Sequence, residues 1–296
     1  MRSGRRPSCS GVVGLAAFHF VRGDQRQARE VTDQCLTLAQ HANDIDALIE
    51  AHFLSGMVSF VMGEFPAGRR NIEECIRLYG PEKRDLHIVL YGQDPKASGL
   101  NWLAMGLWAL GHPDQGLERA RESLAFAQSM SRPFQLARSL AGVGFVHVYR
   151  REPQARDSHL EAAIALCIEQ GFGYFRAMVS AFQGSNLAQL GRTKDGIALM
   201  RDSVRTLRAF GSELLFTIVF GELALAYASI GELDQAAAAV GEGQACVERN
   251  GSIGPKPSSY RIEESCCCWA NRLTLPARKR GSSRPGGRET TACEIL

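Results

Sequence analysis

The chain has 296 residues, of which 45% are hydrophobic and 22% are charged, so it can bury a sizeable core and general disorder is excluded. The formal net charge of +3 comes from the two ends, because residues 7–251 contain more acidic than basic side chains. A body without cationic excess argues against a nucleic-acid partner. No run reaches the ~18 apolar residues that a membrane-spanning helix needs.

The N-terminal segment, residues 1–10, is basic and is expected to be disordered. The apolar stretch that follows could imitate a secretory signal, but it contains His19 and lacks a small-x-small cleavage site. Four cysteines lie singly inside helical patterns, where Cys behaves as a small apolar residue: Cys35, Cys75, Cys167 and Cys246. None of the four forms a CxxC motif or pairs with His at zinc spacing. We therefore expect a reduced, cytoplasmic compartment and no metal site.

From residue 11 to residue 251 the sequence repeats with a period of about forty. The short turns that follow each apolar helix are centred on Gly23, Gly63, Gly111, Arg151, Gly191 and Gly231, at spacings of 40, 48, 40, 40 and 40 residues. The residue seven positions before each turn is always small: Ala16, Gly56, Ala104, Gly144, Gly184 and Ala224. The positions five and twelve after each turn are small in almost every unit. Self-similarity at a fixed period in this range indicates a solenoid.

Each unit is predicted to form a helix, a turn and a second helix. Small residues let two helix backbones approach closely where they cross, and the aliphatic residues beside them fill the grooves. Pro113, Pro133 and Pro153 mark helix starts, where the missing N–H costs nothing. The second helix of the first unit is expected over residues 24–41, and that of the last unit over residues 233–248. The spacing matches a lengthened tetratricopeptide motif, so we predict an all-α, right-handed superhelix of about six helix pairs.

The one spacing of 48 places an insertion at residues 80–98, between the second and third units. Such a segment can fold over the concave groove of a solenoid, or it can be a tolerated linker. Candidate contacts to a partner in the groove are Tyr91, Gln93, Asp94, Trp102, His147 and Asn186. His147 shares its repeat position with His19 and Tyr227, and it can equally be a packing residue. Trp102, like Trp108 on the same helix, can equally belong to the core.

No catalytic, cofactor-binding or metal-binding set stands out in the sequence. There is no GxxxxGK[ST] phosphate loop, and no Ser/His/Asp set has a spacing that places its members together. We therefore expect a protein that is not an enzyme and that holds no cofactor.

Three short motifs resemble a known family. They are residues 110–117 (LGHPDQGL), residues 91–95 (YGQDP) and residues 63–65 (GEF). They are similar to the C-terminal repeat region of large bacterial signalling proteins, which carry an adenylate/guanylate cyclase domain and a signal-transduction ATPase domain before the repeats. The resemblance covers roughly residues 12–251 and lacks the enzymatic domains. It implies the sensor or regulatory end of such a protein.

The sequence thus favours a non-catalytic scaffold that binds a protein, a peptide or a small ligand in its concave groove. Two alternatives stay open: a non-functional fragment of a larger cyclase–ATPase–repeat protein, and an enzyme with its site in the groove. Genomic sequence on either side of the reading frame would separate the fragment from the scaffold, and a titratable cluster in the groove would favour the enzyme.

The tail, residues 252–296, does not continue the repeat. It contains Cys266, Cys267, Cys268 and Trp269, whose TGY and TGG codons read as leucine-type codons and then glycine when shifted by one base. That glycine falls close to position 271, where the next turn of the repeat is due. We expect a disordered tail or a frameshifted seventh repeat. Without a cap, the apolar face of residues 233–247, with Val240 and Val247, would be partly uncovered and would favour self-association.

Overall fold

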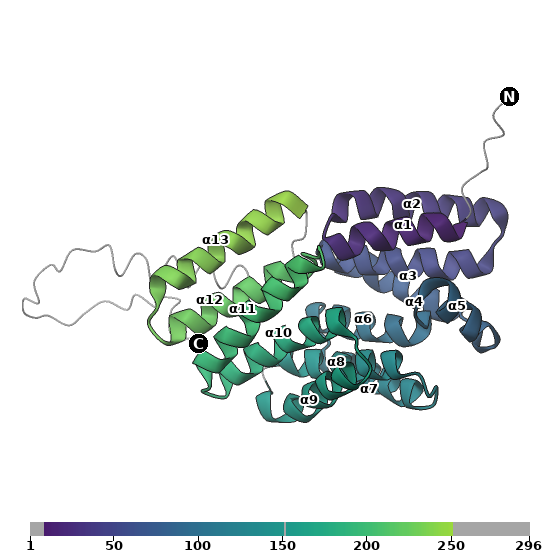
Figure 1. Ribbon diagram of the computed structural model, residues 1–296. Coiled ribbons are helices and arrows are strands. Elements are labelled where there is room, and N and C mark those ends of the chain that lie inside the picture. The colour runs from purple at the N-terminus through teal and green to yellow at the C-terminus, as the bar shows by residue number, and fades with distance from the viewer. Residues whose placement is uncertain (1–8, 151, 251–296) are drawn as a thin grey trace, which may run out of the picture.

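The computed structural model describes residues 9–150 and 152–250, and these residues form thirteen α-helices and one 3₁₀ turn, without any strand (Figure 1). Twelve of the helices form six consecutive hairpins, which we call pairs of an A helix and a B helix. The pairs are α1 (Cys9–Arg22) with α2 (Gln25–Ala42), α3 (Ile45–Val61) with α4 (Phe65–Leu78), α6 (Pro95–Ala109) with α7 (Pro113–Gln128), α8 (Pro133–Arg150) with α9 (Pro153–Glu169), α10 (Gly173–Gln189) with α11 (Thr193–Ala209), and α12 (Phe216–Ser229) with α13 (Leu233–Asn250). The predicted all-α repeat fold with six helix pairs is confirmed.

The turns and helix starts follow the residues that predicted them. The five turn glycines have positive φ, such as +92° at Gly23 and +86° at Gly191, a conformation that glycine adopts without a steric penalty. The sixth turn position, residue 151, lies outside the described residues. Pro113, Pro133 and Pro153 are each the first residue of a helix. Asp24 and Asp44 cap α2 and α3, because their carboxylates accept hydrogen bonds from the backbone N–H groups of Gln27 and Ala47.

The column of small residues marks the crossing of the two helices in each pair. All six members are buried. In the fifth pair the backbones of Gly184 and Gly196 meet: a Cβ on Gly184 would lie 2.7 Å from the carbonyl oxygen of Gly196, and a Cβ on Gly196 would lie 2.4 Å from that of Gly184. In the fourth pair a Cβ on Gly144 would meet a side chain, 2.5 Å from Cδ2 of Leu160. Close backbone contact is therefore the reason for these glycines.

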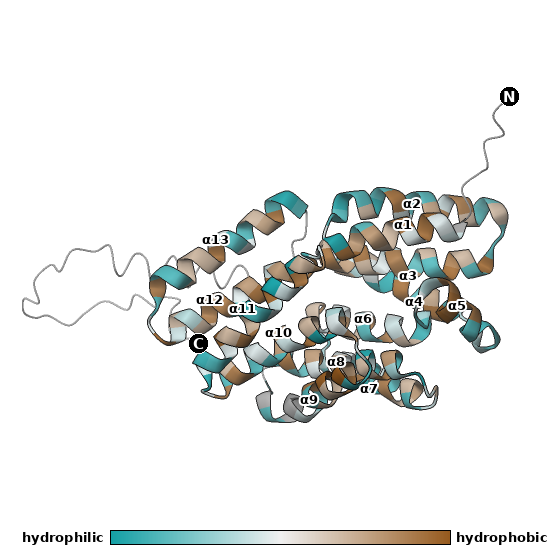
Figure 2. Cartoon of the chain, viewed as in Figure 1, coloured by the Kyte–Doolittle hydropathy of each residue, from teal (hydrophilic) through white to brown (hydrophobic). Residues whose placement is uncertain are grey.

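The A helices form the inside of the superhelix and the B helices form the outside. Consecutive A helices pack against one another, as α1 does against α3 and α6 against α8. Hydrophilic residues recur along the outer helices α2 and α13 (Figure 2). On α13, Val240 and Val247 are half-buried. The N-terminal residues 1–8 and the tail, residues 252–296, lie outside the described residues.

The insertion forms the short turn η1 (Pro81–Lys83) and the helix α5 (Arg84–Tyr91). It ends before residue 95, because Asp94 already caps α6 by accepting a 2.8 Å hydrogen bond from the N–H of Ala97. His87 of α5 is fully buried, and its Nδ1 lies 2.7 Å from a carboxylate oxygen of Glu50 on α3, which is itself only 1% exposed. The inserted segment is thus fixed to the A helices.

The superhelix closes on itself. The hydroxyl of Ser212, in the connection between α11 and α12, donates a 2.7 Å hydrogen bond to the carbonyl oxygen of Val21 at the end of α1. Next to it, the N–H of Glu213 lies 3.4 Å from the carbonyl oxygen of Arg22. Asn250 Nδ2 donates a 2.8 Å hydrogen bond to the Glu213 carboxylate. We call Val21, Arg22, Ser212, Glu213 and Asn250 the closing contact; in Figure 1 it lies where the end of α1 meets the start of α12.

Candidate functional site: an aromatic pocket on the concave face

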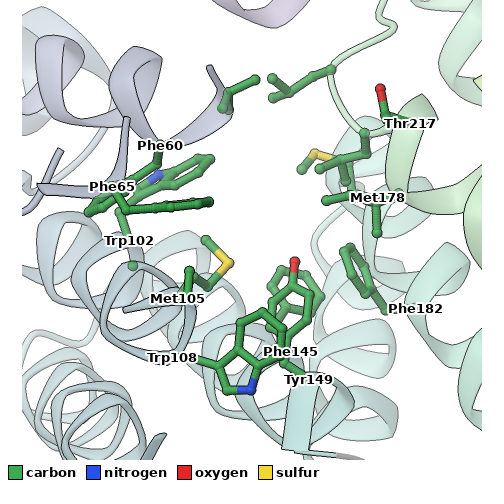
Figure 3. Close-up of a pocket in the computed structure, with 16 residues that line it drawn as sticks. Phe60, Phe65, Trp102, Met105, Trp108, Phe145, Tyr149, Met178, Phe182 and Thr217 are labelled. Atoms are coloured by element: carbon green, nitrogen blue, oxygen red, sulfur yellow. The ribbon is translucent and has the colours of Figure 1, made fainter. Parts of the chain in front are cut away.

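An apolar pocket lies inside the closed superhelix and is lined by the A helices α3, α6, α8, α10 and α12, by Phe65 of the B helix α4, and by the connection that carries the closing contact. It encloses about 760 Å³, part of which is open to solvent. Phe60, Phe65 and Trp102 lie on one side, and Met178, Phe182 and Thr217 lie on the opposite side (Figure 3). The remaining lining residues are Val61, Met105, Gly106, Trp108, Ala109, Phe145, Tyr149, Leu214, Leu215 and Ile218.

The repeat itself places these side chains on one face. Trp102 and Phe182 stand nine residues before the turn of their units, and Met105 and Phe145 stand six before it. Other lining residues occupy positions thirteen before the turn (Met178 and Ile218) and two before it (Val61, Ala109 and Tyr149). These positions differ by four, three and four residues, which is the spacing of one face of an α-helix. The inner face of the A helices is therefore a repeated column of large apolar residues.

Polar groups among the lining side chains are few. The ring of Tyr149 stacks on Trp108 with centroids 4.7 Å apart. Burial raises the pKa of the Tyr149 phenol well above its usual range, and the negative charge of Glu222 raises it further, so this hydroxyl stays neutral. Glu222 in turn accepts a 2.6 Å hydrogen bond from the hydroxyl of Ser185. Neutral hydroxyl and indole groups can orient an apolar ligand but cannot neutralise a charged one.

The closing contact and the pocket share one short segment. Leu214 and Leu215 follow Ser212 and Glu213 directly and line the pocket. Leu214 is 7% exposed and belongs to the core cluster of the first two pairs, whereas Leu215 packs against that cluster and against the clusters of the fourth to sixth pairs. The segment therefore ties the start of the superhelix to its end across the pocket.

Of the six candidate residues, all within the described part of the chain, only Trp102 lines the pocket, where its ring meets Phe20 edge-on at 5.8 Å. His147 is buried at the crossing of α8 and α9, and its Nδ1 lies 2.7 Å from the Glu152 carboxylate. Asn186 is fully buried within α10. The structure thus places His147 and Asn186 in the packing between helices and away from the pocket.

The three candidates in the insertion, Tyr91, Gln93 and Asp94, do not line the pocket. Asp94 is fully buried, caps α6 and accepts a 2.6 Å hydrogen bond from the hydroxyl of Tyr79. Gln93 accepts a 2.5 Å hydrogen bond from Arg138 of α8, and Tyr91 packs against the core of the first two pairs. All three hold the insertion in place.

Sequence reasoning missed most of the pocket. Phe60, Met105, Phe145, Met178 and Phe182 carried no motif, although the columns six, nine and thirteen residues before the turn would have shown the common face of all of them except Phe60. Trp108 was noted only as a companion of Trp102.

The described residues offer neither a metal site nor a membrane-spanning helix. Within residues 9–150 and 152–250, no group of three or more His, Cys, Asp and Glu side chains is arranged to hold a metal ion. In that same part of the chain, none of the helices combines the length and the apolar character needed to cross a membrane. Cys35, Cys75, Cys167 and Cys246 are buried, as expected for small apolar residues inside helices.

Comparison with known proteins identifies the fold. No protein-family model and no curated protein sequence matches the chain. Among solved structures it is similar to a Rap protein complexed with competence and sporulation factor, with 11% identity, a TM-score of 0.62, and 92% of this chain and 78% of that chain covered. It is also similar to the Rap conjugation gene regulator of plasmid pLS20 in complex with the Phr* peptide, with 9% identity, a TM-score of 0.56, and coverage of 92% and 81%.

A third similar structure is the APC/C heterotetramer Cut9–Hcn1, with 12% identity, a TM-score of 0.54, and 93% of this chain and 52% of that chain covered. At such low identity these likenesses establish the fold and nothing finer. They show that the chain contains a tetratricopeptide-like helical repeat region.

Proposed function

We propose that this protein is a non-catalytic repeat scaffold that binds its partner on the concave face, with the aromatic pocket as the anchoring site. The observation that carries the proposal is the column of large apolar side chains that the A helices present to the inside of the superhelix. Ligand sites are typically concave and mostly apolar, with a few polar groups, as this pocket is. The two Rap proteins with the same fold are complexed with a peptide or a named factor, which supports a binding role.

The repeat motifs at residues 63–65, 91–95 and 110–117 support a finer proposal. They are similar to the regulatory repeats of bacterial cyclase–ATPase signalling proteins. The protein would then be the sensor end of such a system and act in the cytoplasm. Its isolated chain should neither cyclise nor hydrolyse ATP, because it has no phosphate loop.

The binding role is tested by a screen with a matched pair of variants. A random peptide display library and a set of uncharged hydrophobic compounds are screened against the wild-type chain. Ala109→Trp fills the pocket from its wall, whereas Ala237→Trp places the same side chain at an exposed position of α13. We expect ligands whose binding is lost in Ala109→Trp and kept in Ala237→Trp. Absence of ligands from both libraries, or ligands indifferent to Ala109→Trp, would contradict the proposal.

A further inference from the structure

We infer that the pocket binds a small, uncharged, apolar molecule and not a peptide main chain, and that the bound molecule holds the superhelix closed. This inference rests on the proposed function, because it concerns the same pocket. It adds the chemical class of the ligand and a consequence of binding.

The lining argues against a peptide main chain. Each peptide unit brings an N–H and a C=O, and burying them without partners costs about 1–3 kcal/mol per group. Among the lining side chains, hydroxyl or indole groups come only from Tyr149, Thr217 and the two tryptophans. Apolar atoms need no partners, so a hydrocarbon or aromatic ligand gains the full benefit of burial. An ionised ligand would meet no opposite charge among the lining residues.

The insertion limits the ligand to the size of the pocket. Glu50 and Arg138 stand thirteen residues before the turns of their units, in the same inner column as Met178 and Ile218 of the pocket. His87 and Gln93 of the inserted segment bind these two side chains at 2.7 Å and 2.5 Å. The inner face of the second and fourth pairs is therefore already occupied beyond the pocket. The space left for a ligand is therefore the pocket between the lining side chains.

Residues 212–215 belong both to the closing contact and to the pocket wall, so they couple ligand binding to closure. A ligand in the pocket contacts Leu214 and Leu215, which follow the two residues that bond to Val21 and Arg22. If the superhelix opened, α1 and α3 would separate from the segment and the ligand would lose one wall. A ligand that binds the closed form better shifts the equilibrium towards it, and closure strengthens binding by the same factor.

The test measures binding of N-phenyl-1-naphthylamine to the full chain. This probe is uncharged and aromatic, and its fluorescence rises in apolar surroundings. We expect saturable binding of one probe per chain, abolished in Ala109→Trp and in Thr217→Trp, which fills the pocket from the opposite wall, and unchanged in Ala237→Trp. Ser212→Ala, which weakens closure without touching the pocket, should raise the dissociation constant about two- to tenfold. Circular dichroism confirms that each variant is folded.

The second part of the test uses the peptides from the display library whose binding is lost in Ala109→Trp. Pocket-dependent peptides together with absence of probe binding would overturn the ligand class and leave the proposed function standing. Failure of both the probe and every peptide to bind the wild type would overturn the inference and the proposed function together. Probe binding that survives both filling variants would place the probe elsewhere and also overturn the inference. An unchanged dissociation constant in Ser212→Ala would overturn the coupling to closure.

Discussion

Ser212 and Val21 are 191 residues apart in the chain, yet the Ser212 hydroxyl donates a 2.7 Å hydrogen bond to the Val21 carbonyl oxygen. The bond joins the connection between the fifth and sixth helix pairs to the first pair, and it is one of the contacts that close the superhelix. The hydroxyl of Tyr174 lies 3.0 Å from the same Ser212 oxygen, so α10 also supports this position. Closure is what gives the aromatic pocket its last wall, formed by Leu214 and Leu215.

Loss of the Ser212 hydroxyl should weaken closure. Ser212→Ala removes the bond to the Val21 carbonyl oxygen, at a cost of about 0.5–1.5 kcal/mol in the free energy of unfolding. The matched control is Ser229→Ala, because Ser229 bonds only to the nearby Ala226 carbonyl oxygen and is exposed. Urea unfolding of both variants measures the difference. Equal midpoints for the two variants would show that closure contributes nothing to stability.

The stability that the closing contact contributes should depend on pH. Burial opposes ionisation of Glu213, but hydrogen bonds from Asn250 and Arg249 outweigh burial, and the net effect lowers the pKa of Glu213 below its ordinary value of 4.5. The folded state therefore binds fewer protons than the unfolded state. The resulting stability is present above pH 4.5 and is lost as pH falls through the lowered pKa.

Glu213→Gln isolates this effect. The stability difference between wild type and variant should be largest at pH 7 and should shrink steadily as the pH is lowered from 5 towards 3, as followed by thermal melting in a pH series. A difference that stays constant across this range would mean that the Glu213 charge does not act in the folded state.

The cost of replacing a glycine by alanine should depend on what its new Cβ would meet. Gly184→Ala drives a Cβ against the Gly196 backbone, which cannot rotate away, and should cost about 1–3 kcal/mol. Gly144→Ala meets the flexible Leu160 side chain and should cost less. Gly241→Ala on α13 meets nothing within 4 Å and should stabilise by about 0.5–1 kcal/mol. Exposed Lys194→Ala should change stability by under ~0.5 kcal/mol. Any other ranking of the three glycine variants in chemical denaturation would contradict these contacts.

The stability of the inserted helix α5 should depend on the buried contact between His87 and Glu50. Glu50→Ala leaves the buried His87 without its carboxylate partner and should cost about 1–3 kcal/mol. Amide hydrogen exchange should rise first in α5. Glu74→Ala breaks an exposed pair with Arg77 and should cost under ~1 kcal/mol. If α5 exchanges no faster in Glu50→Ala than in Glu74→Ala, the pair does not hold the insertion.

The repeat was predictable from sequence because it depends on local geometry. A positive φ at Gly191 and a backbone crossing at Gly184 each require a particular residue type at a fixed distance from the turn. The same columns placed Pro133 at the start of α8. Every one of these features is decided by neighbours within one unit.

The pocket was predictable only in part. Trp102 was expected in the groove and lines the pocket, but His147 and Asn186 turned out to be buried between helices. A column shows which residues share a face, but not how tightly the superhelix curls. The bond between Ser212 and Val21 results from the summed rotation of five units, and no spacing rule reaches across 191 residues.

Closure is tested most directly by a covalent link across it. A Cβ on Gly23 would lie 3.3 Å from the Cβ of Glu213, close to the 3.5–4.5 Å of a disulfide. Gly23→Cys/Glu213→Cys should therefore cross-link under mild oxidation, as shown by peptide mapping with mass spectrometry. Gly111→Cys/Glu213→Cys is the control, because Gly111 has a similar positive φ and nothing within 4 Å of its Cβ position. The account predicts the 23–213 link in most molecules and no 111–213 link. A folded 23/213 variant that fails to cross-link would contradict the closed superhelix.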